Sequence, residues 1–72
     1  STQFDLTLDY ASASQVTVYD ITGKEVESIF DGYLEKGYHK IKWQPESISG
    51  GIYLIHFRIG MQEKTYKTIY LK

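Results

Sequence analysis

The sequence has no cysteine and only one proline in its 72 residues. Without cysteine, no disulfide can staple the chain and no thiolate can hold a metal. Stability must therefore come from an apolar core, although a chain of this length buries only about 60% of the surface that it exposes when unfolded. Trp43 and the three phenylalanines are the largest apolar residues. We expect Trp43 at the centre of the core.

Long apolar runs and an excess of one charge are also missing. The longest apolar run, residues 51–57, is much shorter than the roughly 20 residues that span a membrane, so we predict no transmembrane segment. Eight basic and nine acidic residues are spread along the chain, apart from a loose basic group at Lys64, Lys67 and Lys72. This distribution excludes the basic stripe of a nucleic-acid-binding protein.

Apolar and polar residues alternate along most of the sequence, which is the pattern of half-buried β-strands. No stretch has the i, i+3, i+4 apolar spacing of a long helix. We expect six strands at residues 4–9, 15–20, 24–30, 38–43, 52–59 and 63–72, with residues 33–35 as a candidate seventh. The apolar residues that alternation places together on one face of each strand include Phe4, Leu6, Leu8, Val16, Val18, Ile41, Trp43, Tyr53, Ile55, Phe57 and Ile59.

Glycine and small polar residues mark the reversals of the chain. We expect turns or loops at residues 11–14, 22–23, 31–32, 37, 44–50 and 60–61. Short strands at regular intervals predict an all-β fold, an immunoglobulin-like antiparallel β-sandwich of six or seven strands. In residues 24–30, Ile29 falls opposite the face shared by Val26 and Phe30, which predicts a bulge or burial on both faces.

No pattern typical of an enzyme is present, and we predict no catalytic residue, metal site or cofactor. The two histidines, His39 and His56, both lie within expected strands and accompany no nucleophile motif. Glu25 and Glu27 are expected on one strand face, where they could form a glycosidase pair. A glycosidase acid needs an enclosed site that raises its pKa, so an exposed pair on a thin sandwich is better explained as a solvated face.

Tyrosine is abundant, with seven copies. Tyr38, Tyr66 and Tyr70 are expected opposite the core faces of their strands, where they form a candidate binding face. Exposed tyrosine can stack on sugar rings or anchor a protein partner. Tyrosine is also a common cross-strand residue on half-exposed sheets, so both interpretations remain open.

Four segments, in order, resemble a known family. Residues 18–26, VYDITGKEV, look like VYD-x-x-G-[RK]-x-V, and residues 31–39, DGYLEKGYH, are similar to DG-x-L-x-x-G-x-[HY], with Trp43 following at the expected place. Residues 49–53, SGGIY, match SG-[VI]-Y with one extra glycine, and residues 67–72, KTIYLK, resemble the ending K-x-[IV]-x-[LV]-K. Together they resemble the type A C-terminal sorting domain of the type IX secretion system, which is related to the immunoglobulin-like domain of flagellar hook-capping proteins.

The resemblance implies one domain, residues 1–72, at the C-terminus of a larger secreted cargo protein of a Bacteroidetes-type bacterium. The domain would pass through the periplasm, be read by the outer-membrane translocon and be removed by a sortase-like peptidase, leaving the cargo on the cell surface or outside the cell. It implies recognition through the last hairpin, by Lys67, Leu71 and Lys72, with Gly51 and Tyr53 shaping the preceding strand.

Other interpretations also fit the residues. The chain could be a carbohydrate- or protein-binding β-sandwich attached to a secreted enzyme, or a structural spacer like the flagellar cap module. Lys67 and Lys72 would then be solubilising charges. The exposed terminal strands also make an edge-strand dimer a candidate assembly.

Overall fold

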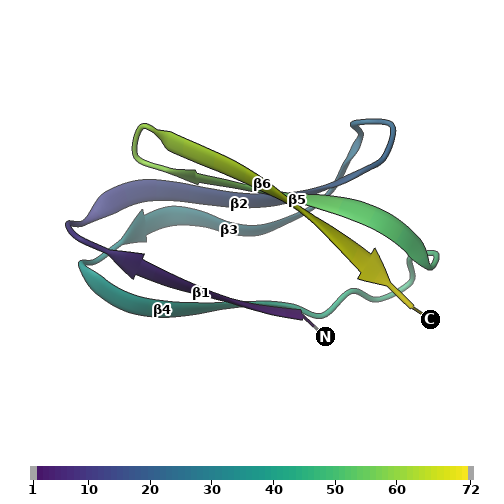
Figure 1. Cartoon of the computed structure of the whole chain (residues 1–72), viewed down its shortest axis with the longest axis horizontal. Coiled ribbons are helices and arrows are strands. Elements are labelled where there is room, and N and C mark those ends of the chain that lie inside the picture. Colours follow the sequence, from purple (N-terminus) through teal and green to yellow (C-terminus); the bar gives the residue numbers. More distant parts are fainter. Residues whose placement is uncertain (1, 72) are drawn as a thin grey trace.

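The computed structural model describes residues 2–71, which form six antiparallel strands in two facing sheets (Figure 1). The strands are β1 (Thr2–Leu8), β2 (Ser12–Asp20), β3 (Glu25–Leu34), β4 (Gly37–Trp43), β5 (Gly51–Ile59) and β6 (Gln62–Tyr70). One sheet pairs β1 with β4, and the other has the order β3-β2-β5-β6. The predicted all-β antiparallel sandwich is confirmed. Within residues 2–71, no helix is long and apolar enough to cross a membrane.

Trp43 lies at the centre of the core, as predicted. It is 1% exposed, and its ring lies edge-on to Tyr53, with ring centroids 5.6 Å apart. Burial of an aromatic side chain of this size removes about 150–250 Å² from water, worth roughly 4–6 kcal/mol. The cluster around it combines Val16 and Val18 of β2, Ile41 of β4, and Ile55 and Phe57 of β5.

Two register shifts interrupt the pairing of β2 with β3. One leaves Ile29 without a partner on β2, and the other leaves Val26 without one. Both side chains are partly buried and pack against the core. The bulge predicted near Ile29 is therefore confirmed, and a second one precedes it in the strand.

The second shift separates the two glutamates of β3. Glu27 lies opposite the buried Val18, whereas Glu25 lies opposite Tyr19. Since directly paired residues share a face of a sheet, the two carboxylates are on opposite faces, and the prediction that they share one is wrong. Glu27 instead accepts a hydrogen bond from the indole N–H of Trp43, at 3.3 Å. The bulge thus supplies an acceptor for the largest core side chain.

The turn predicted at residues 31–32 is wrong, because β3 continues to Leu34. Gly32 pairs with Ser14, and the chain reverses only before Gly37. The same pairing starts β2 at Ser12, so the loop expected at residues 11–14 is shorter than predicted, and residues 33–35 are no separate strand. An Asp-Gly pair favours turns, but here the long hairpin with β2 supplies backbone partners that outweigh this local preference.

The turn predicted at residues 22–23 is confirmed, and Asp20 holds it. One oxygen of its carboxylate accepts hydrogen bonds from the hydroxyl of Thr22 at 2.6 Å and from the backbone N–H groups of Thr22 and Lys24. Gly23 has φ +88°, which glycine adopts without strain. The Thr22 hydroxyl bond, followed by the Lys24 backbone bond, lowers the pKa of Asp20.

We expect Trp43→Ala to lower the free energy of unfolding by about 3–5 kcal/mol, because it leaves a cavity between the sheets. Urea denaturation followed by circular dichroism measures the change. The control Tyr10→Ala removes a side chain that is 75% exposed, and its effect should stay within about 0.5 kcal/mol. Equal destabilisation by the two variants would contradict the central place of Trp43.

We also expect the stability to fall in acid through Asp20. Its pKa is lower in the folded chain than in the unfolded chain, so its stabilisation is present above about pH 4 and is lost as the pH falls through the folded-state value. Asp20→Asn keeps an oxygen acceptor but cannot titrate, so its stability should depend less on pH in this range. Thermal unfolding midpoints between pH 7 and pH 2 test this, and identical profiles for both proteins would refute it.

Candidate functional site

The β5–β6 hairpin carries most of the residues expected to act in recognition. Gly60, with φ +61°, makes the predicted turn between the strands. β6 is the outermost strand of the four-stranded sheet, and within the described residues it pairs only with β5. Its second edge therefore presents unpaired backbone donors and acceptors.

Tyr66 and Tyr70 point into the sandwich, so the prediction that they lie opposite the core face is wrong. The register places Tyr66 opposite the fully buried Ile55. The rings of Tyr66 and Phe57 are 5.6 Å apart, and Tyr70 approaches Trp43 at 6.1 Å. Alternation showed which residues of this strand share a face, but both faces carry apolar side chains. Only the register with β5 determines which face is inside.

Tyr38 does lie opposite its strand's core face, but on the other sheet. Its hydroxyl donates a hydrogen bond to Asp5 Oδ1 at 2.9 Å, and this bond raises the pKa of Tyr38. The side chain is 58% exposed. Since Tyr66 and Tyr70 face inward from the four-stranded sheet, the three tyrosines do not form one surface.

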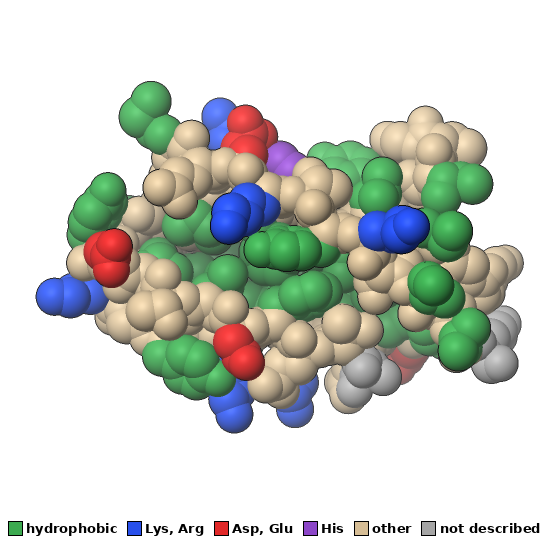
Figure 2. All heavy atoms as spheres, viewed as in Figure 1, with side chains coloured by type: hydrophobic (Ala, Val, Ile, Leu, Met, Phe, Trp, Pro, Cys, Tyr) green, Lys and Arg blue, Asp and Glu red, His purple; other side chains and the backbone are tan. Residues whose placement is uncertain are grey.

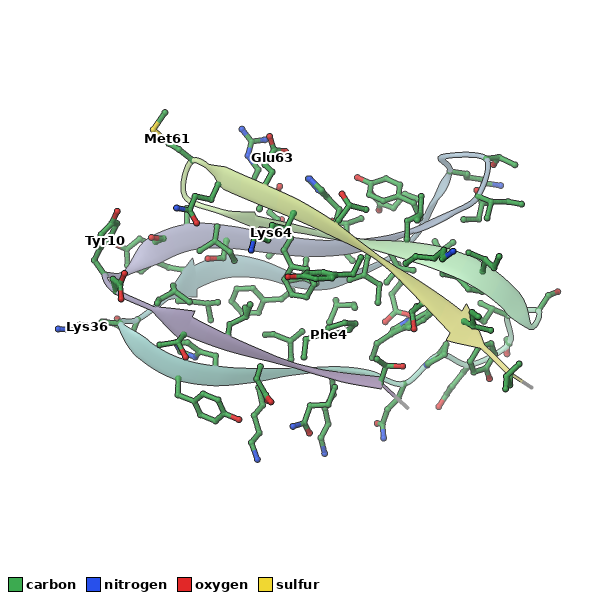
Figure 3. All side chains as sticks on the ribbon, viewed as in Figure 1. Phe4, Tyr10, Lys36, Met61, Glu63 and Lys64 are labelled. Atoms are coloured by element: carbon green, nitrogen blue, oxygen red, sulfur yellow. The ribbon has the colours of Figure 1, made fainter. Side chains whose placement is uncertain are left out.

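A groove between β1 and β6 adjoins the free edge of β6. It has a volume of about 200 Å³, and its lining includes Leu6, Leu8, Ile59 and Lys64. Phe4 continues this side of the sandwich, with its ring edge-on to Phe57 at 5.2 Å. Figure 2 shows hydrophobic side chains at the surface between the two sheets, and Figure 3 shows Phe4 and Lys64 on this side. The free edge of β6 thus borders a partly apolar groove.

The residues predicted for recognition separate into surface and structural positions. Lys67 is exposed and lies opposite Leu54 on the outer face of the sheet. Leu71 directly follows β6 and is 84% exposed. Lys72 lies outside the described residues. Lys67 and Leu71 are thus accessible on the last strand and just beyond it.

Gly51 and Tyr53 instead shape the start of β5. Tyr53 is 8% exposed, and its hydroxyl donates a hydrogen bond to the carbonyl of Ser49 at 2.6 Å. Gly51 has φ +153°, a conformation that other residues rarely adopt. These two residues determine how the chain enters β5, the strand with which β6 pairs.

The histidines have structural surroundings. His39 Nε2 is 2.7 Å from the carbonyl oxygen of Glu35, and His56 Nε2 is 3.1 Å from Glu63 Oε1. His56 also borders an open depression on the outer face together with Tyr19 and Leu54. Among the described residues, no group of three or more His, Asp or Glu side chains is placed to hold a metal ion.

Sequence reasoning missed an apolar region on the outer face. Ile52 and Ile69 lie directly opposite each other and are 42% and 62% exposed. Ile21, in the turn after β2, is 71% exposed. The sequence feature that could have predicted this region is that the last two strands carry apolar residues on both faces.

The comparisons with known proteins identify one family. The family model described as "Secretion system C-terminal sorting domain" matches residues 1–72. No curated protein and no solved structure matches the chain at a significant level. The match covers all four segments that carry the sequence resemblance.

Adjacent glycines offer a matched test of the start of β5. We expect Gly51→Ala to destabilise the fold by about 1–3 kcal/mol, because alanine is strained at this φ. Gly50 is not among the positive-φ glycines, so Gly50→Ala should be neutral or stabilising by up to about 1 kcal/mol. Denaturant unfolding compares the two, and a larger loss for Gly50→Ala would contradict the assigned role of Gly51.

Proposed function

The chain belongs to the family of secretion system C-terminal sorting domains, and we propose that the secretion machinery recognises it at the free edge of β6. Members of this family are signals that direct cargo proteins through the type IX secretion system. The family is not catalytic. The cargo is secreted to the outer membrane or the cell exterior.

The position of β6 at the border of its sheet carries this proposal. An edge strand can accept an additional strand, whose backbone hydrogen bonds supply affinity and whose side chains supply selection. β6 extends from Gln62 to Tyr70 without a proline, so no residue of the strand lacks a backbone donor. An incoming strand would also cover the apolar groove between β1 and β6.

Lys67 and Leu71 are the described side chains that we assign to selection. Both are exposed, and they lie on β6 or directly after it. Lys72 completes the proposed set by its place in the sequence. Gly51 and Tyr53 act indirectly, because they fix the strand against which β6 is registered.

Because the signal is a whole domain, we propose an order for folding, recognition and cleavage. We infer that residues 1–72 form one domain joined to an upstream cargo and that the fusion folds in the periplasm. The translocon then binds β6, and a sortase-like peptidase separates the domain from cargo that has reached the cell surface or the medium. The continuous core around Trp43 supports independent folding.

The alternative of a sugar-binding or protein-binding module depended on a tyrosine face. Tyr70 packs against the core instead, and Tyr66, although 46% exposed, faces the groove beside β1. Tyr38 lies on the other sheet. No arrangement of the three within the described structure favours this function over sorting.

A secretion assay tests the proposal. Residues 1–72 are fused to a fluorescent cargo with a periplasmic signal peptide in a bacterium that has a type IX system, and fluorescence is measured in the medium, on the cell surface and in the periplasm. We expect export of the intact fusion and periplasmic retention when residues 67–72 are deleted. A strain without the translocon serves as the control. Full export of the deleted fusion would refute recognition through the last strand.

Charge reversal at Lys67 tests selection by side chains. If Lys67 meets a carboxylate of the translocon, Lys67→Glu should reduce export about fivefold, the equivalent of roughly 1 kcal/mol for one exposed ion pair. Lys67→Arg should retain export. Lys42→Glu, on the exposed face of β4 opposite the neutral Gln3, is the matched control and should behave like the unmodified domain. Equal export by all four fusions would show that Lys67 only solubilises the edge.

A further inference from the structure

The outer face of the four-stranded sheet is polar in its middle rows. Across the middle of the sheet, Thr17 lies opposite His56, and His56 lies opposite Thr65. Nearer the β5–β6 turn, Gln15 lies opposite Arg58, and Arg58 opposite Glu63. These rows have the composition expected of a sheet face in contact with water.

The opposite end of the same face is apolar. Ile52 and Ile69 form a cross-strand pair there, and Ile21 follows the last residue of β2 at the same end. We call these three exposed side chains the isoleucine patch. Figure 2 shows hydrophobic side chains gathered at the end of the molecule where Figure 1 places the C-terminus. The three isoleucines thus cluster at this end of the face, whereas exposed Tyr33 and Met61 lie at the other end.

The clustering of three exposed isoleucines at one end of the outer face needs an explanation. A single exposed isoleucine is ordinary on a protein surface, but clustered exposed apolar side chains mark interaction sites. The inner face at this end already packs on the core through Tyr53 and Tyr70, so the isoleucines are not needed to fill the sandwich. The patch is available to a partner.

Two observations define that partner. The first is that the patch adjoins the proposed recognition segment, because Ile69 lies between Lys67 and Leu71. The second is charge. The row beside the patch runs from Glu25 on β3 through Tyr19 and Leu54 to Lys67 on β6. The charge nearest the Ile52–Ile69 pair is therefore positive, and the carboxylate lies at the far border of the sheet.

We propose that the isoleucine patch is a second contact surface for the secretion machinery, occupied by a protein face that is apolar and carries a carboxylate beside Lys67. This inference rests on the proposed function and adds to it. The edge of β6 offers backbone bonds in the plane of the sheet, whereas the patch offers apolar contact perpendicular to it. A partner that reaches around β6 touches both surfaces.

The test uses the fluorescent fusion with Ile52→Thr and Ile69→Thr combined. Threonine keeps the β-branched shape that suits a strand but removes apolar surface. We expect export to fall about tenfold, as at the centre of a protein interface, with the thermal unfolding midpoint of the domain little changed. Ile21→Thr, in a turn rather than a strand, should reduce export without any effect on strand pairing.

Met61→Thr is the matched control. Met61 is fully exposed in the turn at the other end of the sheet, away from the patch (Figure 3). The substitution removes exposed apolar surface from a position that the proposed partner does not reach. Its export should equal that of the unmodified fusion, and a tenfold loss here would overturn a localised patch.

The remaining outcomes separate the two proposals. Normal export of the isoleucine variants, together with retention of the fusion lacking residues 67–72, would overturn the patch and leave recognition through β6 intact. Normal export of the fusion that lacks residues 67–72 would overturn recognition through β6. If sedimentation shows that the domain is a dimer that the isoleucine variants convert to an exported monomer, the patch joins two copies and our assignment of its partner is wrong.

Discussion

The packing of the two sheets around Trp43 is the interaction on which the rest of the structure depends. β1 and β4 share no backbone ladder with the other four strands, so side chains provide nearly all of the contact between the sheets. Trp43 projects from β4 into the residues of β2 and β5, and its indole N–H reaches Glu27 on β3. A small sandwich without disulfides has few other ways to bury enough surface.

This architecture leaves the sandwich open on one side. β6 ends its sheet, and the facing sheet contains only two strands, so the free edge of β6 and the groove beside β1 remain accessible. Most proteins protect such an edge, because it can pair with other chains. Under the recognition that we propose, the same exposure is useful, because it offers the secretion machinery an edge that does not depend on the attached cargo.

The two faces of the last hairpin have different tasks. The inner face carries Tyr70, which packs against the core, and the 46% exposed Tyr66, whose ring lies 5.6 Å from that of Phe57. The outer face carries the exposed Lys67 and Ile69. Side chains that face the sandwich therefore alternate along β6 with those that we propose for recognition. A shift of one residue in its register would exchange them, which explains why the strained glycine and the anchored tyrosine at the start of β5 matter to a surface that they do not form.

The sequence by itself determined the all-β class, the central place of Trp43, the turn at residues 22–23 and the family. These features depend on local alternation, on the chemistry of one turn and on short motifs, which all appear in the order of residues. Tertiary structure alone decided that Tyr66 and Tyr70 face inward, that Glu25 and Glu27 are on opposite faces and that Gly32 lies in a strand. Alternation shows which residues share a face, but the pairing partner decides which face is buried, and a single bulged residue reverses the answer for everything beyond it.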